Sequence, residues 1–227
     1  MVTRAWWLSA ALFCSPGIAA AQSPRDLLTQ ASFHDRDQAA AMRHIAGAHS
    51  AATAQLRRQP DDREAALMQA TALGYRAKLT GSRQEAVAAR RALEALVQRH
   101  PGDAERQLAL GAWHMGAVHR VGRLVARAAL GASKGSGLSA LDRAVALGGD
   151  RALYPGLTAL LRLQMDPADA RGRQLAEAAA RAAAPTPLDR QMKRAAATVL
   201  GSLKGGDGQA TRRLAAKLLP LGWIDGG

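Results

Sequence analysis

Aromatic residues are scarce in this chain of 227 residues, where Phe, Trp and Tyr together make up 4% of the sequence. Hydrophobic residues make up 48%, but many of them are alanines, which favour helices and have small side chains. No stretch alternates strictly between apolar and polar residues over the length of a strand. The composition therefore predicts an all-α protein with closely packed helices and argues against a sheet.

Cysteine is almost absent, because Cys14 is the only one in the chain. A bacterial lipoprotein is acylated on a cysteine that follows a small residue, whereas Phe13 precedes Cys14 here. We therefore do not expect a lipoprotein. A disulfide within one chain is excluded by the count alone.

Residues 1–21 differ from the rest of the chain and have the layout of a secretory signal peptide. Arg4 precedes an apolar run over residues 5–13, which is too short to span a bilayer. Small residues follow at 19–21, where a signal peptidase would read them. We expect cleavage before Gln22, a periplasmic or secreted mature protein, and no stable insertion in the membrane after cleavage. A retained anchor is the alternative.

Acidic residues are also few: 18 Asp and Glu oppose 31 Lys and Arg, giving a formal net charge of +13. Such a charge attracts anions of many kinds. Because nucleic acid is scarce outside the cytoplasm, we expect no nucleic-acid partner. Acidic proteins, anionic lipid head groups and cell-wall polymers are the partners that the charge favours, although a merely solvated basic surface would have the same composition.

Two segments that start 41 residues apart resemble each other. PDDREAALMQATAL begins at Pro60 and PGDAERQLALGAWH begins at Pro101, and both follow the pattern P-x-D-x-E-x-x-L. A helix, a turn and a second helix fit between the two starts, and a weaker third start lies at residues 148–150. The pattern predicts repeated helical hairpins, stacked in antiparallel pairs.

The segment between the signal peptide and the first expected helix, residues 22–36, looks like a short polar lead. The helical-repeat domain is expected over residues 37–227, with an irregular Gly-rich insertion at about 117–137. Nine or ten helices are expected in one stack. They include helices at 37–58, 62–79, 83–100, 138–147, 151–164, 170–184, 188–203 and 209–219, with Trp223 folding back as a cap.

The repeated segments resemble tetratricopeptide repeats, in a divergent form whose period is 41 residues instead of about 34. The resemblance rests on a first-helix pattern at Pro101, Leu110, Gly111 and His114 and on a second-helix pattern at Ala89, Leu93 and Leu96. It implies an α-solenoid whose first helices line a concave groove. The groove positions that we select on this basis are Tyr75, Glu105 and Met115.

A basic face is predicted next to the irregular insertion. Arg120, Arg123 and Arg127 recur at spacings of three and four residues, and Lys134 lies just beyond them. Guanidinium groups pair well with phosphates and carboxylates. The face is therefore a candidate site for an anion or an acidic peptide, and the alternative is a solvated helix edge.

Motifs of common enzymes and metal sites are absent. The sequence contains no H-E-x-x-H, no G-x-S-x-G and no phosphate-binding loop. His44 and His49, like His114 and His119, are five residues apart, which points the two rings of each pair in different directions on a helix. We expect no metal site, no cofactor and no enzymatic activity.

Three functions are compatible with these features. The first is a non-catalytic scaffold or adaptor for proteins or peptides, and the second is a carrier of a small anionic solute or lipid associated with transport. The third is a cell-wall enzyme that uses an isolated glutamate. An open groove favours the adaptor, an enclosed pocket with basic residues facing it favours the carrier, and a lone buried carboxylate favours the enzyme.

Overall fold

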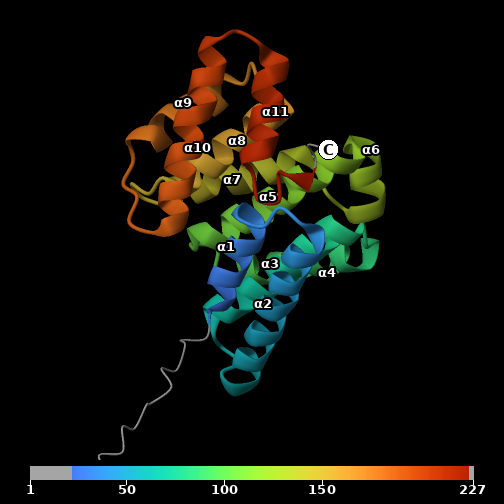
Figure 1. Cartoon of the computed structure of the whole chain (residues 1–227). Helices are drawn as coiled ribbons and strands as arrows, with labels where there is room; N and C mark the ends of the chain where they lie inside the picture. Colours follow the sequence, from blue (N-terminus) through green and yellow to red (C-terminus); the bar gives the residue numbers. More distant parts are fainter. Residues whose placement is uncertain (1–21, 225–227) are drawn as a thin grey trace, which may run out of the picture.

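The computed structural model describes residues 22–224, and in this range it contains eleven α-helices, one π-helical turn and no strand. The predicted signal peptide, its cleavage site and Cys14 lie outside the described residues. Neighbouring helices pack in pairs along the chain, so the protein is all-α and solenoid-like, as predicted. Figure 1 shows α1 to α4 in the lower part, α9 to α11 in the upper part, and α5, α7 and α8 between them.

The first four helices are α1 (Pro24–Phe33), α2 (Gln38–Arg58), α3 (Arg63–Thr80) and α4 (Arg83–Arg99). The segment that we expected to be a polar lead is thus a helix. Ser23 and Asp26 form a reciprocal capping box around Pro24, and the apolar side of the helix buries Leu28 and Ala31. A ten-residue helix with so few apolar residues gives a weak periodic signal, and only its capping residues mark it.

The two repeat starts have equivalent structures. α3 begins after Asp62, whose carboxylate accepts a hydrogen bond from the Ala65 N–H. α5 (Ala104–Val121) begins after Asp103, which caps its helix in the same way. The matched leucines, Leu67 and Leu108, are both buried. The 41-residue pattern therefore marks two corresponding helix starts.

The irregular region contains α6 (Arg123–Val125), a π-helical turn η1 (Ala126–Leu130) and α7 (Lys134–Leu147). We expected the irregular insertion to continue to about residue 137 and the next helix to begin at 138, but α7 already begins at Lys134. Ser133 caps this helix by accepting from the Ser136 N–H, and Gly137 allows α7 to pack closely against Met115 of α5. Gly137 thus serves helix packing.

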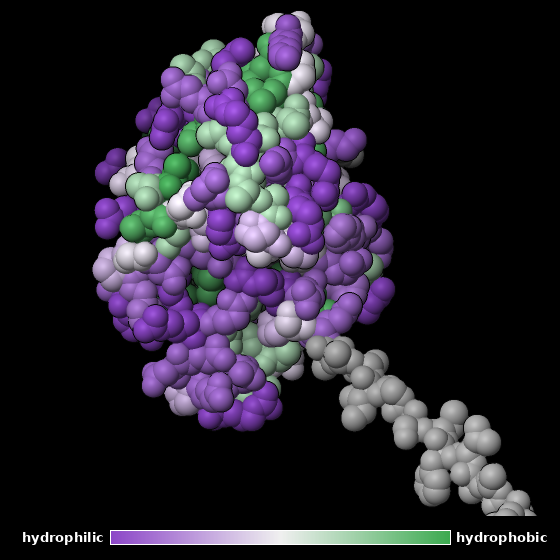
Figure 2. Space-filling model, turned by 90° about the vertical axis from the view of Figure 1, so that its left-hand side faces the viewer, coloured by the Kyte–Doolittle hydropathy of each residue, from purple (hydrophilic) through white to green (hydrophobic). Residues whose placement is uncertain are grey.

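The C-terminal helices are α8 (Leu153–Met165), α9 (Ala170–Arg181), α10 (Pro187–Lys204) and α11 (Gly208–Leu218). Residues 153–164 of α8 are all buried, because α9, α10 and α11 pack around this helix. Hydrophilic side chains dominate the face of the molecule shown in Figure 2, with smaller apolar areas between them. The mean hydropathy of −0.14 agrees with an apolar interior under a polar surface.

Two main hydrophobic cores lie inside the stack. One joins α1 to α4, and the other joins α5 with α7 to α11. The C-terminal segment crosses from the second core to the first, where Leu221 is completely buried and Trp223 packs. The Leu221 N–H donates to the Ser32 carbonyl at 3.0 Å. The end of the chain thereby ties α11 to α1.

Candidate functional site

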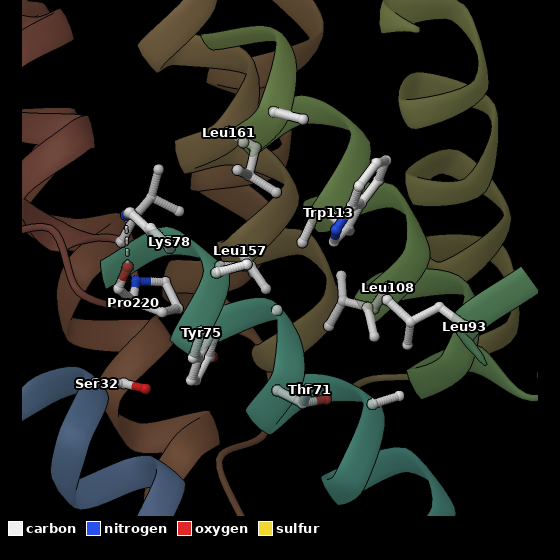
Figure 3. A pocket seen from close by; sticks show the side chains of 18 of the residues that line it. Ser32, Thr71, Tyr75, Lys78, Leu93, Leu108, Trp113, Leu157, Leu161 and Pro220 are labelled. Carbon is white, nitrogen blue, oxygen red and sulfur yellow. Dashed lines mark hydrogen bonds between the residues drawn. The ribbon is translucent and has the colours of Figure 1, made fainter. Parts of the chain in front are cut away.

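A cavity of about 430 Å³ lies between the first helices of the two repeats and the central helix α8. Its walls come mainly from α1, α3, α5 and α8, and the residues 219–220 and η1 add to them. Most of the lining side chains are apolar. Figure 3 shows labelled side chains from three of these helices: Thr71, Tyr75 and Lys78 of α3, Leu108 and Trp113 of α5, and Leu157 and Leu161 of α8.

Small residues on α3 and α5 leave room for the cavity. Gly74 of α3 and Ala109, Ala112 and Gly116 of α5 all line it. A Cβ atom added at Gly116 would meet no other atom within 4 Å. The shortage of large side chains in the sequence therefore has a local consequence, because the facing helices do not fill the space between them.

An ion-pair cluster lies at one end of the cavity, where Arg25 and Glu105 line it. Arg25 of α1 donates to Glu64 at 2.6 Å from Nε and at 2.7 Å from Nη2, and its Nη1 contacts Glu105. Glu64 and Glu105 are matched residues of the two repeats and lie in the first turns of α3 and α5. Burial disfavours the charged guanidinium, but the two carboxylates outweigh it and raise the pKa of Arg25. This cluster fixes α1 across both repeats.

The other end of the cavity is basic. Lys78 lies in the last turn of α3 and His119 and Arg120 lie in the last turn of α5, and Arg83 follows at the start of α4. Lys78 Nζ donates to the carbonyls of Pro220 and Leu221 at 3.1 and 3.4 Å. Arg83 Nε donates to the carbonyl of Ala129 at 2.9 Å. Lys78, Arg83 and Arg120 bring positive charge to one end of an apolar cavity.

Tyr75 contributes a phenol to the cavity wall. Burial raises the pKa of Tyr75, although the nearby Ser32 hydroxyl and the Arg25 charge partly oppose this shift. The phenol is therefore neutral at physiological pH and can donate or accept a hydrogen bond. It supplies a polar group in the cavity wall, close enough to Arg25 for the guanidinium charge to act on it.

The predicted site residues do not all meet at one place. Tyr75, Glu105 and Arg120 line the cavity, whereas the buried Met115 packs against Gly137 of α7. Three further basic residues of the prediction are not in the cavity wall: Arg123 and Arg127, which are exposed, and Lys134, which begins α7.

Sequence reasoning missed several residues of the cavity. Arg25 was overlooked because its segment was taken for a lead, although Ser23 and Asp26 mark the start of a helix. Lys78 and Arg83 carry no motif, and only the packing of the two repeats brings them to the same cavity. Helix ends that lie far apart in sequence cannot be paired from local patterns alone.

Within residues 22–224, no group of three or more His, Cys, Asp or Glu side chains is placed to hold a metal ion. A search of the same residues finds no helix with the length and hydropathy needed to span a membrane. Comparison of the chain with protein-family models, with curated proteins and with solved structures finds no match.

Proposed function

We propose that the protein is an exported, non-catalytic carrier that binds a single-chain anionic amphiphile, with the apolar chain in the cavity and the anionic head group at its basic end. The observation that carries this proposal is the apolar cavity of about 430 Å³ between α3, α5 and α8. Its volume falls in the usual range for small-molecule sites, roughly 300–1,000 Å³. The hairpins over residues 60–116 are, on the same proposal, divergent tetratricopeptide repeats.

The walls of the cavity favour an acyl chain. Each methylene group transferred from water to apolar surroundings contributes about 0.8 kcal/mol. Leu108, Leu157 and Leu161 offer such surroundings, and Tyr75 is a neutral hydrogen-bonding group beside them. The affinity is therefore expected to rise with chain length until the cavity is full.

The basic end favours an anionic head group. Lys78, Arg83 and Arg120 line the cavity there, and the acid in the cavity wall, Glu105, is bound to Arg25. A carboxylate or phosphate at this end gains charge-assisted hydrogen bonds from such groups. An uncharged head group of the same size gains weaker hydrogen bonds. We therefore expect the protein to bind an anionic amphiphile more tightly than an uncharged one.

The same ion pairs argue against the enzyme hypothesis. A general acid or base needs a carboxylate that is free to exchange a proton with the substrate. The carboxylates of Glu64 and Glu105 are instead both paired with the Arg25 guanidinium, and these pairs also hold α1 in place. A protein or peptide adaptor is less well supported, because the groove position Met115 lies in the interior between α5 and α7.

The test is the binding of fatty acids of increasing chain length, with fatty alcohols of the same lengths as uncharged probes. We expect two added methylenes to tighten binding by roughly tenfold, and the acids to bind more tightly than the alcohols. Gly116→Trp fills the cavity and should weaken binding by at least about tenfold. The control is Gly201→Trp on α10, where an added Cβ also meets no atom within 4 Å but the cavity is not touched.

Affinity that is independent of chain length, or equal in the Gly116→Trp and Gly201→Trp variants, would contradict the carrier. Fatty alcohols that bind as tightly as the acids would contradict the role of the basic end. Arg83→Gln supplies a second check, because it should reduce the preference for the acid and leave the dependence on chain length unchanged.

A further inference from the structure

Exposed large hydrophobic residues gather in one short segment of the described chain. Among residues 22–224, the three large apolar residues classed as exposed are Val121, Leu124 and Val125, with exposed fractions of 39%, 86% and 54%. Single exposed apolar residues are ordinary, but a cluster surrounded by polar groups marks an interaction site. We call residues 120–131, which include α6 and η1, the α6 tip.

The backbone of the α6 tip holds these side chains outward. Gly122, at φ +78°, ends α5, and Gly131, at φ +68°, ends the π-helical turn. Ala126 is completely buried against Val118, and Arg83 of α4 binds the Ala129 carbonyl. The tip is therefore anchored at its base while Leu124 projects into solvent. π-Helical turns occur frequently at functional sites.

The charge of the α6 tip has one sign. Arg120, Arg123 and Arg127 are exposed on it, and the sequence contains no Asp or Glu between Glu105 and Asp142. The neighbouring helix α4 carries two acids, but Glu85 is paired with Arg76 and Glu94 with Arg90. The exposed apolar side chains thus lie among arginines, and their own segment contains no acidic residue.

We propose that the α6 tip docks on a membrane surface that contains anionic lipids, with Leu124 and Val125 entering the interface and Arg123 and Arg127 contacting the head groups. Apolar residues flanked by arginines suit such a surface, which attracts basic segments and accepts apolar side chains at the boundary of the acyl chains. A stable protein interface buries about 800 Å² on each partner. Three exposed side chains on a small protrusion fit shallow membrane contact better.

The position of the tip relates it to the cavity. Val121, Val125 and Leu130 also line the cavity, so the proposed membrane contact adjoins its basic end. Docking there would place the cavity next to the lipid surface from which an amphiphile is taken or to which it is delivered. This inference goes beyond the carrier function and does not require it, because the surface exists whether or not the cavity is filled.

The test is sedimentation of the purified protein with vesicles of phosphatidylcholine, with and without phosphatidylglycerol. We expect binding to the anionic vesicles that decreases with added salt. Leu124→Asp should weaken it by at least about tenfold, and Arg123→Gln with Arg127→Gln by roughly 25-fold. The matched control is Arg171→Gln with Arg173→Gln, which removes the same charge from exposed positions on α9.

Equal binding to neutral and anionic vesicles would overturn the proposal. So would an equal loss of vesicle binding in the Arg123/Arg127 and the Arg171/Arg173 double variants. So would unchanged vesicle binding of Leu124→Asp, or capture of a specific protein by the tip without any vesicle binding. Gly116→Trp separates the two proposals, since this variant should bind the fatty acid more weakly and should still bind the anionic vesicles. Fatty-acid binding without vesicle binding would contradict the membrane docking but not the carrier function.

Discussion

His114 is a buried base between two helices of the second core. The residue is 4% exposed, its ring packs edge-to-face with Trp113 at 5.2 Å between ring centroids, and its Nδ1 accepts from the Ser133 N–H at 3.4 Å. Burial lowers its pKa, the Arg90 charge lowers it further, and Glu94 opposes them in part. The folded protein therefore prefers the neutral imidazole, which is the form that can accept the Ser133 bond.

This preference predicts how stability depends on pH. Because the pKa of His114 in the folded state is below the ordinary value of about 6.5, the unfolded chain binds more protons just below that pH. The neutral imidazole makes its full contribution to the free energy of unfolding above about pH 6.5. This contribution is lost as the pH falls towards the folded pKa, by up to about 1.4 kcal/mol per pH unit. Urea denaturation at several pH values should show that the free energy of unfolding decreases less with falling pH in His114→Gln than in the wild type. Equal pH profiles in both proteins would rule out this role.

Leu108 and Leu124 are leucines in opposite environments, with exposed fractions of 3% and 86%. Leu108→Asp places a charge among apolar side chains and is expected to lower the free energy of unfolding by roughly 3–5 kcal/mol. Leu124→Asp serves as the control and should change it by less than about 0.5 kcal/mol. Thermal melts of both variants and the wild type measure these changes in stability. A melting temperature for Leu108→Asp equal to that of the wild type would mean that position 108 is not in the interior.

The starts of α3 and α5 could be predicted well from the sequence, because helix caps are local. Asp62 and Asp103 sit at the start of similar apolar patterns and do begin α3 and α5. The basic face was predicted less well. Arg120, Arg123 and Arg127 share one face only if the helix is continuous, but Gly122 ends α5 between them and η1 changes the turn that follows. Backbone breaks of this kind depend on packing and leave a weak local signal.

Glycine has opposite effects at two positions of α5. A Cβ at Gly111 would lie 2.7 Å from the Leu141 Cγ and 3.0 Å from the Gly137 carbonyl oxygen, whereas a Cβ at Gly116 would meet nothing within 4 Å. Gly111→Ala is expected to destabilise the protein by about 1–3 kcal/mol, because α5 and α7 must separate. Gly116→Ala should stabilise it by about 0.5–1 kcal/mol through helix propensity. Chemical denaturation of both variants checks this, and effects of the same sign would contradict the close packing of α5 on α7.

The arrangement of the whole molecule is the part that sequence patterns could least predict. The first core depends on Leu221, which lies about two hundred residues from α1 in the chain. Lys78 binds the carbonyls of Pro220 and Leu221, and Leu219 and Pro220 also line the cavity. No local motif pairs a chain end with a distant helix. The size of the cavity could not be predicted either, since it depends on how the two cores are held apart.

The same C-terminal contact predicts coupling between the ends of the chain. Leu221 is completely buried against the first core and holds its backbone at φ +56°, so packing outweighs an unfavourable conformation. Leu221→Ala is expected to lower the free energy of unfolding by about 2–4 kcal/mol and to speed hydrogen exchange in α1, whose Ser32 carbonyl accepts from the Leu221 N–H. Leu218→Ala is the control, because Leu218 packs on the second core and should leave α1 protected. Exchange in α1 that responds equally to both substitutions, or to neither, would show that the C-terminal segment does not join the two cores.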